Sequence, residues 1–203
     1  TMDSLGVAAR YVHDARGHSG RRAFQTANAL ELPFDDGCFD IVLLQHVAMN
    51  IFDRGRLYRE IRRVLKSGGR FATFDVVLGG GQPDYPLPWA RTPATSFLMT
   101  IDATREAIEP AGFRMLAWQD DTETAKAWFA QLRASGPPPS PNLGGVMGPD
   151  FAELAANLGR NLMEGRLGIL TAVFEAASTR ARANRPTSRT TRPIIIRSRR
   201  ASS

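Results

Sequence analysis

The stretch Arg63-Val-Leu-Lys-Ser-Gly-Gly-Arg-Phe-Ala-Thr-Phe-Asp-Val-Val-Leu78 decides the expected fold, together with the apolar run Phe39–Leu44 (FDIVLL) that precedes it. The earlier run is almost continuously apolar and shows no polar alternation. Such a run is typical of a strand that is buried on both faces, as in a parallel sheet. We therefore expect Phe39–Leu44 to be an inner strand.

The residues between these two stretches have a helical pattern. Over Asp53–Lys66, apolar residues recur at helical spacing while arginines occupy the other faces, which predicts an amphipathic helix. Lys66 and the pair Gly68-Gly69 have the chemistry of a helix C-terminus, and the strand Arg70–Leu78 follows at once. Strand, helix, glycine pair and strand together predict a right-handed βαβ crossover that joins two neighbouring parallel strands.

The rest of the body continues the alternation, and we expect an α/β fold. Beyond a short strand candidate at Ala23–Thr26, the predicted elements are a helix from Thr100 to Ala111, a strand at Phe113–Gln119, a helix at Thr122–Arg133, a helix at Asp150–Glu164 and a strand at Ile169–Glu175. A loop rich in glycine and proline spans Gly79–Pro93, and long loops of this kind often act as lids.

Composition restricts the possible classes of protein. The 203 residues are 43% hydrophobic and 23% charged, which suits one globular domain, and no apolar run reaches the ~18–20 residues of a membrane span. We see no secretory signal and expect a cytoplasmic protein that does not bind membranes. Cys38 is the single cysteine, which excludes an intramolecular disulfide and a cysteine-based zinc site, and we expect no metal.

The net charge of +6 comes from the C-terminal tail. Residues 178–203 hold eight arginines and no acidic residue, so removing these eight from the 26 basic residues leaves 18 basic against 20 acidic residues. The tail has no periodicity and is expected to be disordered. It could bind nucleic acid electrostatically, but it lacks aromatic residues that would stack on bases, so a non-native extension is the simpler interpretation.

Three motifs resemble those of a known family. Asn28–Asp40 (NALELPFDDGCFD), Gln45-His46-Val47 and Arg63–Phe71 (RVLKSGGRF) are similar to segments of class I S-adenosylmethionine-dependent methyltransferases, with Ser67 where proline is usual. The similarity runs from about Ala23 to Glu175. QHVAMNI at 45–51, Pro88-Trp89-Ala90 and the segment 161–166 further resemble the glycine/sarcosine/dimethylglycine N-methyltransferase branch.

This resemblance implies a Rossmann-like sheet whose last strand is antiparallel. It also implies a glycine-rich loop after the first strand and an acidic residue after the second strand, and both are incomplete here, since Gly6 is the one glycine left in Ser4–Val12. We therefore expect a sheet without its first two strands, an unpaired edge at Phe39–Leu44, and a truncated or internally deleted domain. The expected parts are a remnant at 1–22, a methyltransferase-like domain at 23–177 and the tail at 178–203.

The resemblance also assigns site residues. S-adenosyl-L-methionine is the implied cofactor, with contacts from Gly6, Asn28, Ala29, Leu30, Gln45 and Val47. His46 is the implied catalytic base, and the methyl acceptor, a small molecule with an amine, is expected to contact His46, Asn50, Trp89 and Arg166.

Simpler interpretations of these residues stay open. Asn28 and Asn50 are ordinary turn formers, Trp89 can pack its loop on the body, and Arg166 can lie on a solvated face. Asp40 is expected to make structural hydrogen bonds, whereas Asp75 either faces the cleft or caps a neighbour. Two other functions also remain: an inactive methyltransferase fragment that cannot hold the cofactor, and a nucleic-acid-binding module that uses the basic tail.

Overall fold

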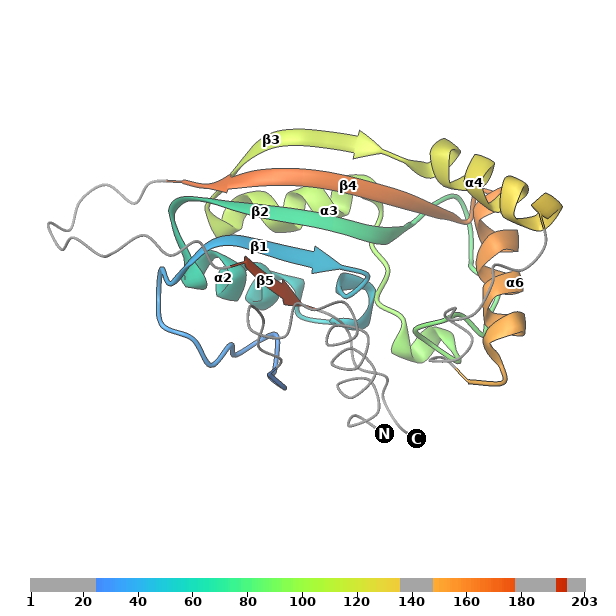
Figure 1. The fold of residues 1–203 in the computed structure, drawn as a ribbon, viewed down its shortest axis with the longest axis horizontal. Coiled ribbons are helices and arrows are strands. Elements are labelled where there is room, and N and C mark those ends of the chain that lie inside the picture. Colours follow the sequence, from blue (N-terminus) through green and yellow to red (C-terminus); the bar gives the residue numbers. More distant parts are fainter. Residues whose placement is uncertain (1–24, 136–147, 178–192, 197–203) are drawn as a thin grey trace, which may run out of the picture.

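The computed structural model describes residues 25–135, 148–177 and 193–196. They form one mixed sheet with the strand order β3-β4-β2-β1-β5 and helices packed around it (Figure 1). The strands are β1 (Phe39–Gln45), β2 (Leu65–Leu78), β3 (Phe113–Asp120), β4 (Leu167–Ala176) and β5 (Pro193–Ile196). The helices are α2 (Arg54–Val64), α3 (Ile101–Ile108), α4 (Thr122–Ser135) and α6 (Phe151–Met163), with short 3-10 turns η2 (Ala48–Asn50), η3 (Pro93–Thr95) and η4 (Glu109–Ala111).

The predicted crossover is present. β1 and β2 are parallel neighbours, with Val42 opposite Phe71 and Leu44 opposite Thr73, and α2 connects them. Asp53 begins α2, because its carboxylate accepts a hydrogen bond from the Arg56 backbone N–H at 2.8 Å. The helices predicted after Thr100, Asp121 and Asp150 and the strands predicted at 113–119 and 169–175 are also present within a few residues.

The glycine pair has another role than predicted. α2 ends at Val64, and β2 already begins at Leu65, which pairs with Phe39, so Gly68 and Gly69 lie inside the strand and do not cap the helix. A Cβ on Gly69 would lie 3.0 Å from the Asp40 carbonyl oxygen, so this close approach requires glycine. Lys66 does not serve the helix C-terminus either, because its ammonium pairs with Asp40 at 2.9 Å. The structural role expected for Asp40 is thereby confirmed.

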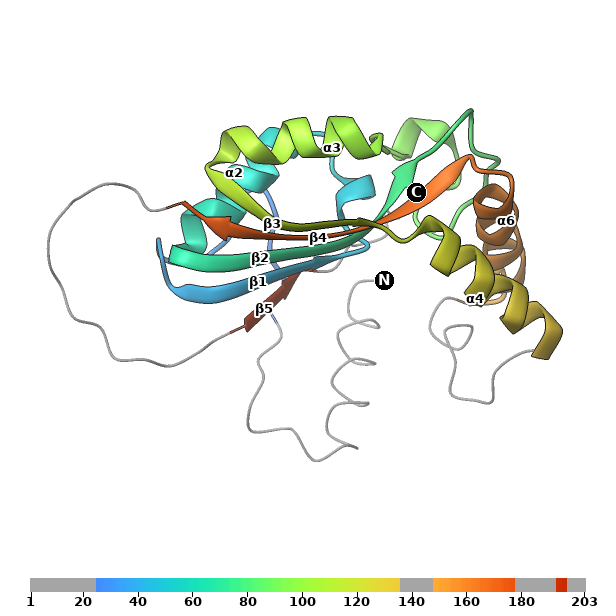
Figure 2. The same ribbon diagram turned by 90° about the horizontal axis from the view of Figure 1, so that it is seen from above.

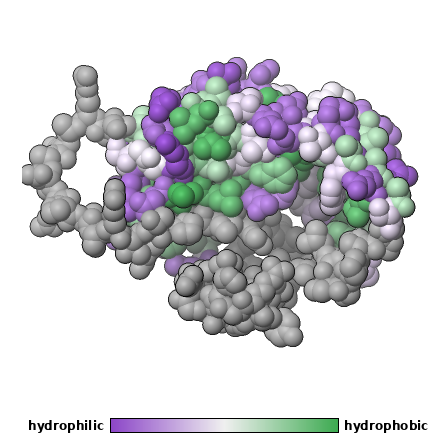
Figure 3. Space-filling model, turned by 45° about the horizontal axis from the view of Figure 1, so that its top comes forward, coloured by the Kyte–Doolittle hydropathy of each residue, from purple (hydrophilic) through white to green (hydrophobic). Residues whose placement is uncertain are grey.

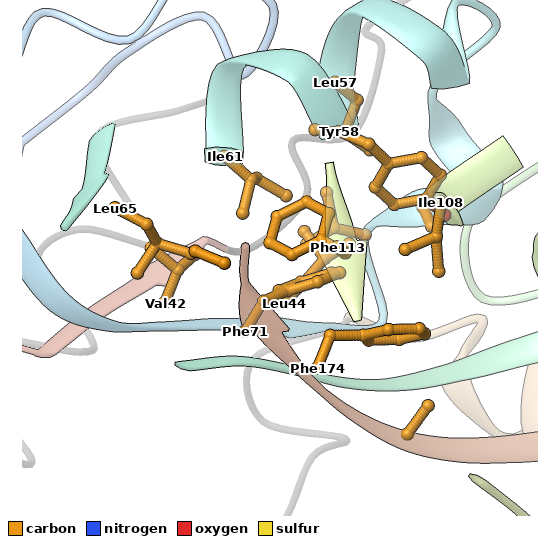
Figure 4. Close-up of a cluster of buried hydrophobic side chains, with 14 of the residues drawn as sticks. Val42, Leu44, Leu57, Tyr58, Ile61, Leu65, Phe71, Ile108, Phe113 and Phe174 are labelled. Atoms are coloured by element: carbon orange, nitrogen blue, oxygen red, sulfur yellow. The ribbon is translucent and has the colours of Figure 1, made fainter. Parts of the chain in front are cut away.

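The core lies between the sheet and the pair α2 and α3, which cover one face of it (Figure 2). Phe71 from β2 and Phe174 from β4 stack with ring centroids 5.8 Å apart, and Phe113 packs beside them (Figure 4). Val42 and Leu44 of β1 are completely buried in this cluster. Each of these large side chains contributes roughly 1.5–3 kcal/mol on burial, which makes the β1-α2-β2 unit the stable frame of the domain.

The remaining strands complete the sheet on both sides of this frame. β4 is antiparallel to both β2 and β3, as expected for the last strand of the body. α4 and α6 pack together at one end of the sheet (Figure 2). Gln25 and Thr26 are not in a strand, so the described half of the strand predicted at 23–26 was wrong, while Ala23 and Phe24 lie outside the described residues.

The outer edge of β1 differs from the prediction of an unpaired edge and a wholly disordered tail. Pro193–Ile196 form β5, which pairs with β1 in parallel, with Val42 opposite Ile194 and Leu44 opposite Ile196. The physical reason is that three consecutive isoleucines have high strand propensity and that an inner strand such as β1 offers free backbone groups at its edge. The rest of the tail lies outside the described residues.

Some large apolar side chains remain at the surface. A space-filling view shows hydrophobic residues interspersed with hydrophilic ones on one face (Figure 3). The exposed large hydrophobic residues are Ile41, Phe52, Leu116, Trp128 and Met163. Phe52 is the most exposed of them, with 82% of its surface accessible.

Candidate functional site

The candidate site lies at the edge of the sheet where the parallel strands β1 and β2 end. Because β4 is antiparallel to β2, it begins at this same edge, with Leu167 opposite Leu78. The segment before α3 runs here as well, since the Leu78 N–H donates to the Met99 carbonyl oxygen at 2.8 Å. In open α/β sheets, ligands bind beyond the carboxyl ends of the strands, so a ligand-binding site is expected at this edge.

His46 directly follows β1 and has an unusual backbone. Its φ of 53° lies in the left-handed region, which non-glycine residues rarely adopt, and its N–H donates to the Phe74 carbonyl oxygen at 3.0 Å. The imidazole contacts the Phe74 ring edge-to-face, with centroids 4.9 Å apart. Backbone strain of this kind costs on the order of 1–3 kcal/mol and persists where the surrounding structure enforces it, often at functional sites.

The surroundings of His46 favour a neutral imidazole. The residue is exposed, but nearby protein atoms still desolvate its ring and lower its pKa below the ordinary value of 6.5. A neutral imidazole has a free nitrogen lone pair near pH 7 and can accept a proton. The structure therefore places an imidazole with a lowered pKa at the carboxyl edge of the sheet.

A buried carboxylate supports the loop that carries His46. Asp75, near the end of β2, accepts hydrogen bonds from the backbone N–H groups of Ala48 at 2.9 Å and of Val76 at 3.2 Å. Burial raises the pKa of Asp75 to about 6, against the lowering effect of these bonds and of the nearby Arg54. Of the two interpretations open from the sequence, capping is the one that the structure shows, because the carboxylate holds the first N–H of η2.

Arg54 joins this loop to the segment before α3. Its guanidinium donates to the carbonyl oxygens of Ile51 at 3.0 Å and Phe97 at 2.9 Å and to the Tyr58 hydroxyl at 3.2 Å. The Phe97 N–H in turn donates to the Met49 carbonyl oxygen at 2.8 Å. Sequence analysis did not single out Arg54, although a cation in the first turn of a helix works against the helix dipole and signals another role.

The predicted residues Gln45, Val47 and Asn50 lie in the same short segment as His46. Val47 is buried, and its carbonyl oxygen accepts from both the backbone N–H and the side-chain amide of Asn50, at 2.9 and 3.3 Å. Asn50 therefore closes the turn η2, which agrees with its simpler interpretation as a turn former. Gln45 is half-buried and is the last residue of β1.

Trp89 lies in the long loop between β2 and α3. Its ring packs against a second apolar cluster that contains Met49, Val76 and Leu87, and its indole N–H donates to the Ser96 Oγ at 3.0 Å. The loop is thus held on the body next to η2, and Trp89 is partly buried in that contact.

Arg166 lies just before β4, near the site edge, and its side chain belongs to an ion-pair network. Its guanidinium pairs with Asp84 and with Glu164, while its backbone carbonyl accepts from the Gly79 N–H at 2.8 Å. The fully buried Asn161 also holds Asp84, by accepting from its N–H at 2.8 Å and donating to its carbonyl oxygen at 2.9 Å. These contacts hold the long loop against α6. Arg166 makes structural contacts through both its guanidinium and its backbone carbonyl.

Asn28, Ala29 and Leu30 are held against the start of α2. The Asn28 side-chain oxygen accepts from the Leu30 N–H at 3.0 Å, and Arg56 donates to the Leu30 carbonyl oxygen at 2.9 Å. Ala29 and Leu30 pack partly against the main core. This turn therefore lies against the first turn of α2, whereas Gly6 lies outside the described residues.

Other kinds of site are not found in the described part of the chain. There, no group of three or more His, Cys, Asp and Glu side chains is placed to hold a metal ion. No helix among the described residues is long and apolar enough to cross a membrane. A hollow on α4, lined by Trp128, Gln131, Leu132 and Ser135, contains none of the predicted site residues.

Comparisons with known proteins agree with this geometry. A family described as a methyltransferase domain matches residues 5–73. An O-methyltransferase of Pyrenophora dematioidea is 28% identical over 74% of this chain and 55% of its own length, and a sarcosine/dimethylglycine N-methyltransferase of Halorhodospira halochloris is 29% identical over 51% and 37%. The chain spans about half the length of the curated relatives that it matches.

The fold is also found among solved structures. The crystal structure of geranyl diphosphate C-methyltransferase from Streptomyces coelicolor A3(2), in complex with Mg2+, geranyl diphosphate and S-adenosyl-L-homocysteine, has a TM-score of 0.61 and 18% sequence identity. The match covers 81% of this chain and 57% of that chain. This likeness supports the Rossmann-like sheet inferred from the sequence.

Proposed function

We propose that the chain is a class I S-adenosylmethionine-dependent methyltransferase, which transfers a methyl group from S-adenosyl-L-methionine to the amine of a small-molecule acceptor. The observation that carries the proposal is His46, a base with a lowered pKa at the carboxyl edge of β1. An alkyl ammonium must lose a proton before its nitrogen can attack, and a neutral imidazole can take it.

The proposed cofactor contacts come from two segments near this edge. Gln45 and Val47 end β1 and begin the next turn, and the left-handed backbone of His46 between them turns the chain away from the strand. The turn Asn28–Leu30 approaches from the side of α2. We assign these residues to cofactor binding together with Gly6, and when bound the cofactor supplies an electrophilic methyl group.

The task of the chain in such a reaction is mainly to position the reactants. Methyl transfer needs the nucleophile in line with the methyl group, and holding both partners in that geometry can lower the barrier by ~7–11 kcal/mol. The loop of His46 suits this purpose because Asp75 and Arg54 fix it from two sides. His46 then needs only to receive the proton that the amine releases.

The test measures cofactor binding and methyl transfer separately. We expect the full chain to bind S-adenosyl-L-homocysteine in isothermal titration calorimetry and to transfer a labelled methyl group to a primary amine. His46→Asn is the informative variant, because asparagine tolerates the left-handed backbone. It should retain cofactor binding and lose about a hundredfold or more in rate.

The pH dependence adds a second readout. The wild-type rate should fall as the pH drops below the lowered pKa of His46, and His46→Asn should lack this decline. Trp128→Ala, which removes an exposed side chain that is not among the predicted site residues, is the control and should behave as the wild type. Absence of cofactor binding by the full chain would instead favour the inactive fragment.

A further inference from the structure

Two aromatic side chains stand together at the surface beside the candidate site. The rings of Phe52 and Phe97 contact edge-to-face with centroids 5.5 Å apart and an interplanar angle of 72°. Phe52 is 82% exposed, while Phe97 is half-buried. A single exposed apolar residue is ordinary, but a paired aromatic surface next to a site of chemistry suggests a ligand contact.

The backbone under this pair is firmly held. Arg54, itself only 7% exposed, donates to the carbonyl oxygen of Ile51, just before Phe52, and to that of Phe97 itself. The Phe97 N–H donates to the Met49 carbonyl oxygen at 2.8 Å. The backbone that carries the two rings is therefore held in place before any ligand arrives, and a preformed surface binds with less loss of conformational entropy.

The pair is at the carboxyl edge of the sheet. Phe52 lies six residues after His46, beyond the turn η2, and Phe97 lies two residues before Met99, which accepts from Leu78 at the end of β2. Both rings thus extend from segments that leave the ends of β1 and β2, as His46 does. A molecule that contacts this pair would therefore be within the region of the proposed chemistry.

The charged groups beside the pair are already engaged. Asp53 accepts the backbone N–H of Arg56 as the cap of α2, and the guanidinium of Arg54 is used by three oxygen acceptors. The pair consequently offers apolar ring surface and not a free charge. Such a surface favours an aromatic or flat apolar group over a small zwitterion.

We propose that Phe52 and Phe97 form a binding wall for the aromatic body of the methyl acceptor, so that the acceptor class is an arylalkylamine. This inference rests on the proposed function for the identity of the ligand as an acceptor. The ring would contact the wall while the amine reaches toward His46.

The test compares two amines by NMR chemical-shift titration of the full chain. 2-Phenylethylamine is the aromatic probe, and propylamine is the matched amine without a ring. We expect 2-phenylethylamine to bind more tightly than propylamine and to perturb the signals of Phe52 and Phe97. Phe52→Ala and Phe97→Ala should each weaken 2-phenylethylamine binding by about three- to tenfold, the range of one aromatic contact, and should leave propylamine binding unchanged.

The controls distinguish binding at this wall from nonspecific binding to exposed aromatic residues. Trp128→Ala removes another exposed aromatic residue, 56% accessible on α4, and should leave both affinities unchanged. Phe52 is so exposed that Phe52→Ala should fold normally, which the melting temperature verifies. The proposed wall would be contradicted if the two amines bound with equal affinity or if neither bound. It would also be contradicted if Trp128→Ala weakened 2-phenylethylamine binding as much as Phe52→Ala does. Retained wall binding without methyl transfer would refute only the proposed function.

Discussion

The Asp75 carboxylate lies 2.9 Å from the backbone nitrogen of Ala48 and thereby connects the end of β2 to the turn that follows β1. Two neighbouring parallel strands are joined here by a buried side chain as well as by their backbone ladder. The contact fixes the turn immediately after His46. The position of the candidate base therefore depends on a residue from the adjacent strand.

Asp75→Asn should change how stability depends on pH. In the fold, burial raises the pKa of Asp75 to about 6 from its ordinary 3.8, so the protonated form stabilises the fold. That contribution is complete below about pH 4 and is lost as the pH rises through about 6, for a change of about 3 kcal/mol. Asparagine keeps an oxygen for the Ala48 N–H and cannot ionise.

Urea denaturation from pH 4 to pH 8 measures this effect. The free energy of unfolding of the wild type, minus that of Asp75→Asn, should decrease by roughly 2–3 kcal/mol across the range. Taking the difference cancels the other carboxylates, which titrate in both proteins. A difference that stays constant with pH would show that Asp75 titrates as an ordinary carboxylate.

His46 provides a test of backbone conformation. His46→Gly and His46→Ala both lose the imidazole contact with Phe74, so their difference isolates the cost of the left-handed φ of 53°. Glycine adopts this conformation freely, whereas alanine does not. We expect His46→Gly to be more stable than His46→Ala by about 1 kcal/mol in thermal unfolding. Equal stability would mean that the loop relaxes out of this conformation.

Much of the sheet follows from local sequence, and the failures have physical causes. The run Phe39–Leu44 and the helical spacing before Gly68 were sufficient to predict β1, α2 and β2 as one crossover. The start of β2 was misplaced because Leu65 pairs with Phe39. A pairing between residues far apart in the sequence cannot be predicted from the residues around Leu65 alone. The glycines were correctly noticed but were assigned to the wrong element.

The place of the candidate residues at the end of a strand was predictable from the sequence, whereas the residues that support their loop were less so. Gln45, His46 and Val47 stand where a buried strand ends, and that position identified them. The role of Arg54 depends on carbonyl oxygens of Ile51 and Phe97, and the second of these is 43 positions away along the chain. Such contacts are set by packing between segments, which periodicity does not reveal.

Asn161→Ala should loosen the long loop between β2 and α3. Asn161 is completely buried and satisfies the backbone N–H and carbonyl of Asp84 as well as the Asn157 carbonyl. Removing it leaves the Asp84 N–H and carbonyl without this partner, at a cost of about 2–3 kcal/mol in the free energy of unfolding. Limited proteolysis should then cut within residues 79–100 faster than in the wild type.

Glu164→Ala is the matched control for this loop. Glu164 contacts the same network through an exposed ion pair with Arg166, and such pairs contribute at most about 1 kcal/mol. Its stability and its cleavage pattern should therefore stay close to those of the wild type. Similar effects of the two substitutions would show that the buried amide is not what fastens the loop.

Removing residues 178–203 should expose the outer edge of β1. This deletion removes β5, whose backbone pairs with residues Ile41–Leu44. An open inner strand is a template for pairing with another chain, so we expect faster amide exchange over 39–45 and concentration-dependent self-association. Hydrogen exchange with mass spectrometry and analytical ultracentrifugation measure these two changes. Unaltered exchange over 39–45 would contradict a role of β5 in protecting this edge.

The pairing of β5 with β1 has a consequence for the order of folding during synthesis. β1 is synthesised before β5, which lies about 150 residues later in the sequence, so this contact is among the least local in the described residues. The nascent domain must therefore assemble β1, β2 and β4 while the outer edge of β1 is still unpaired. Chaperones that bind extended apolar segments could bind at that edge until residues 193–196 have emerged.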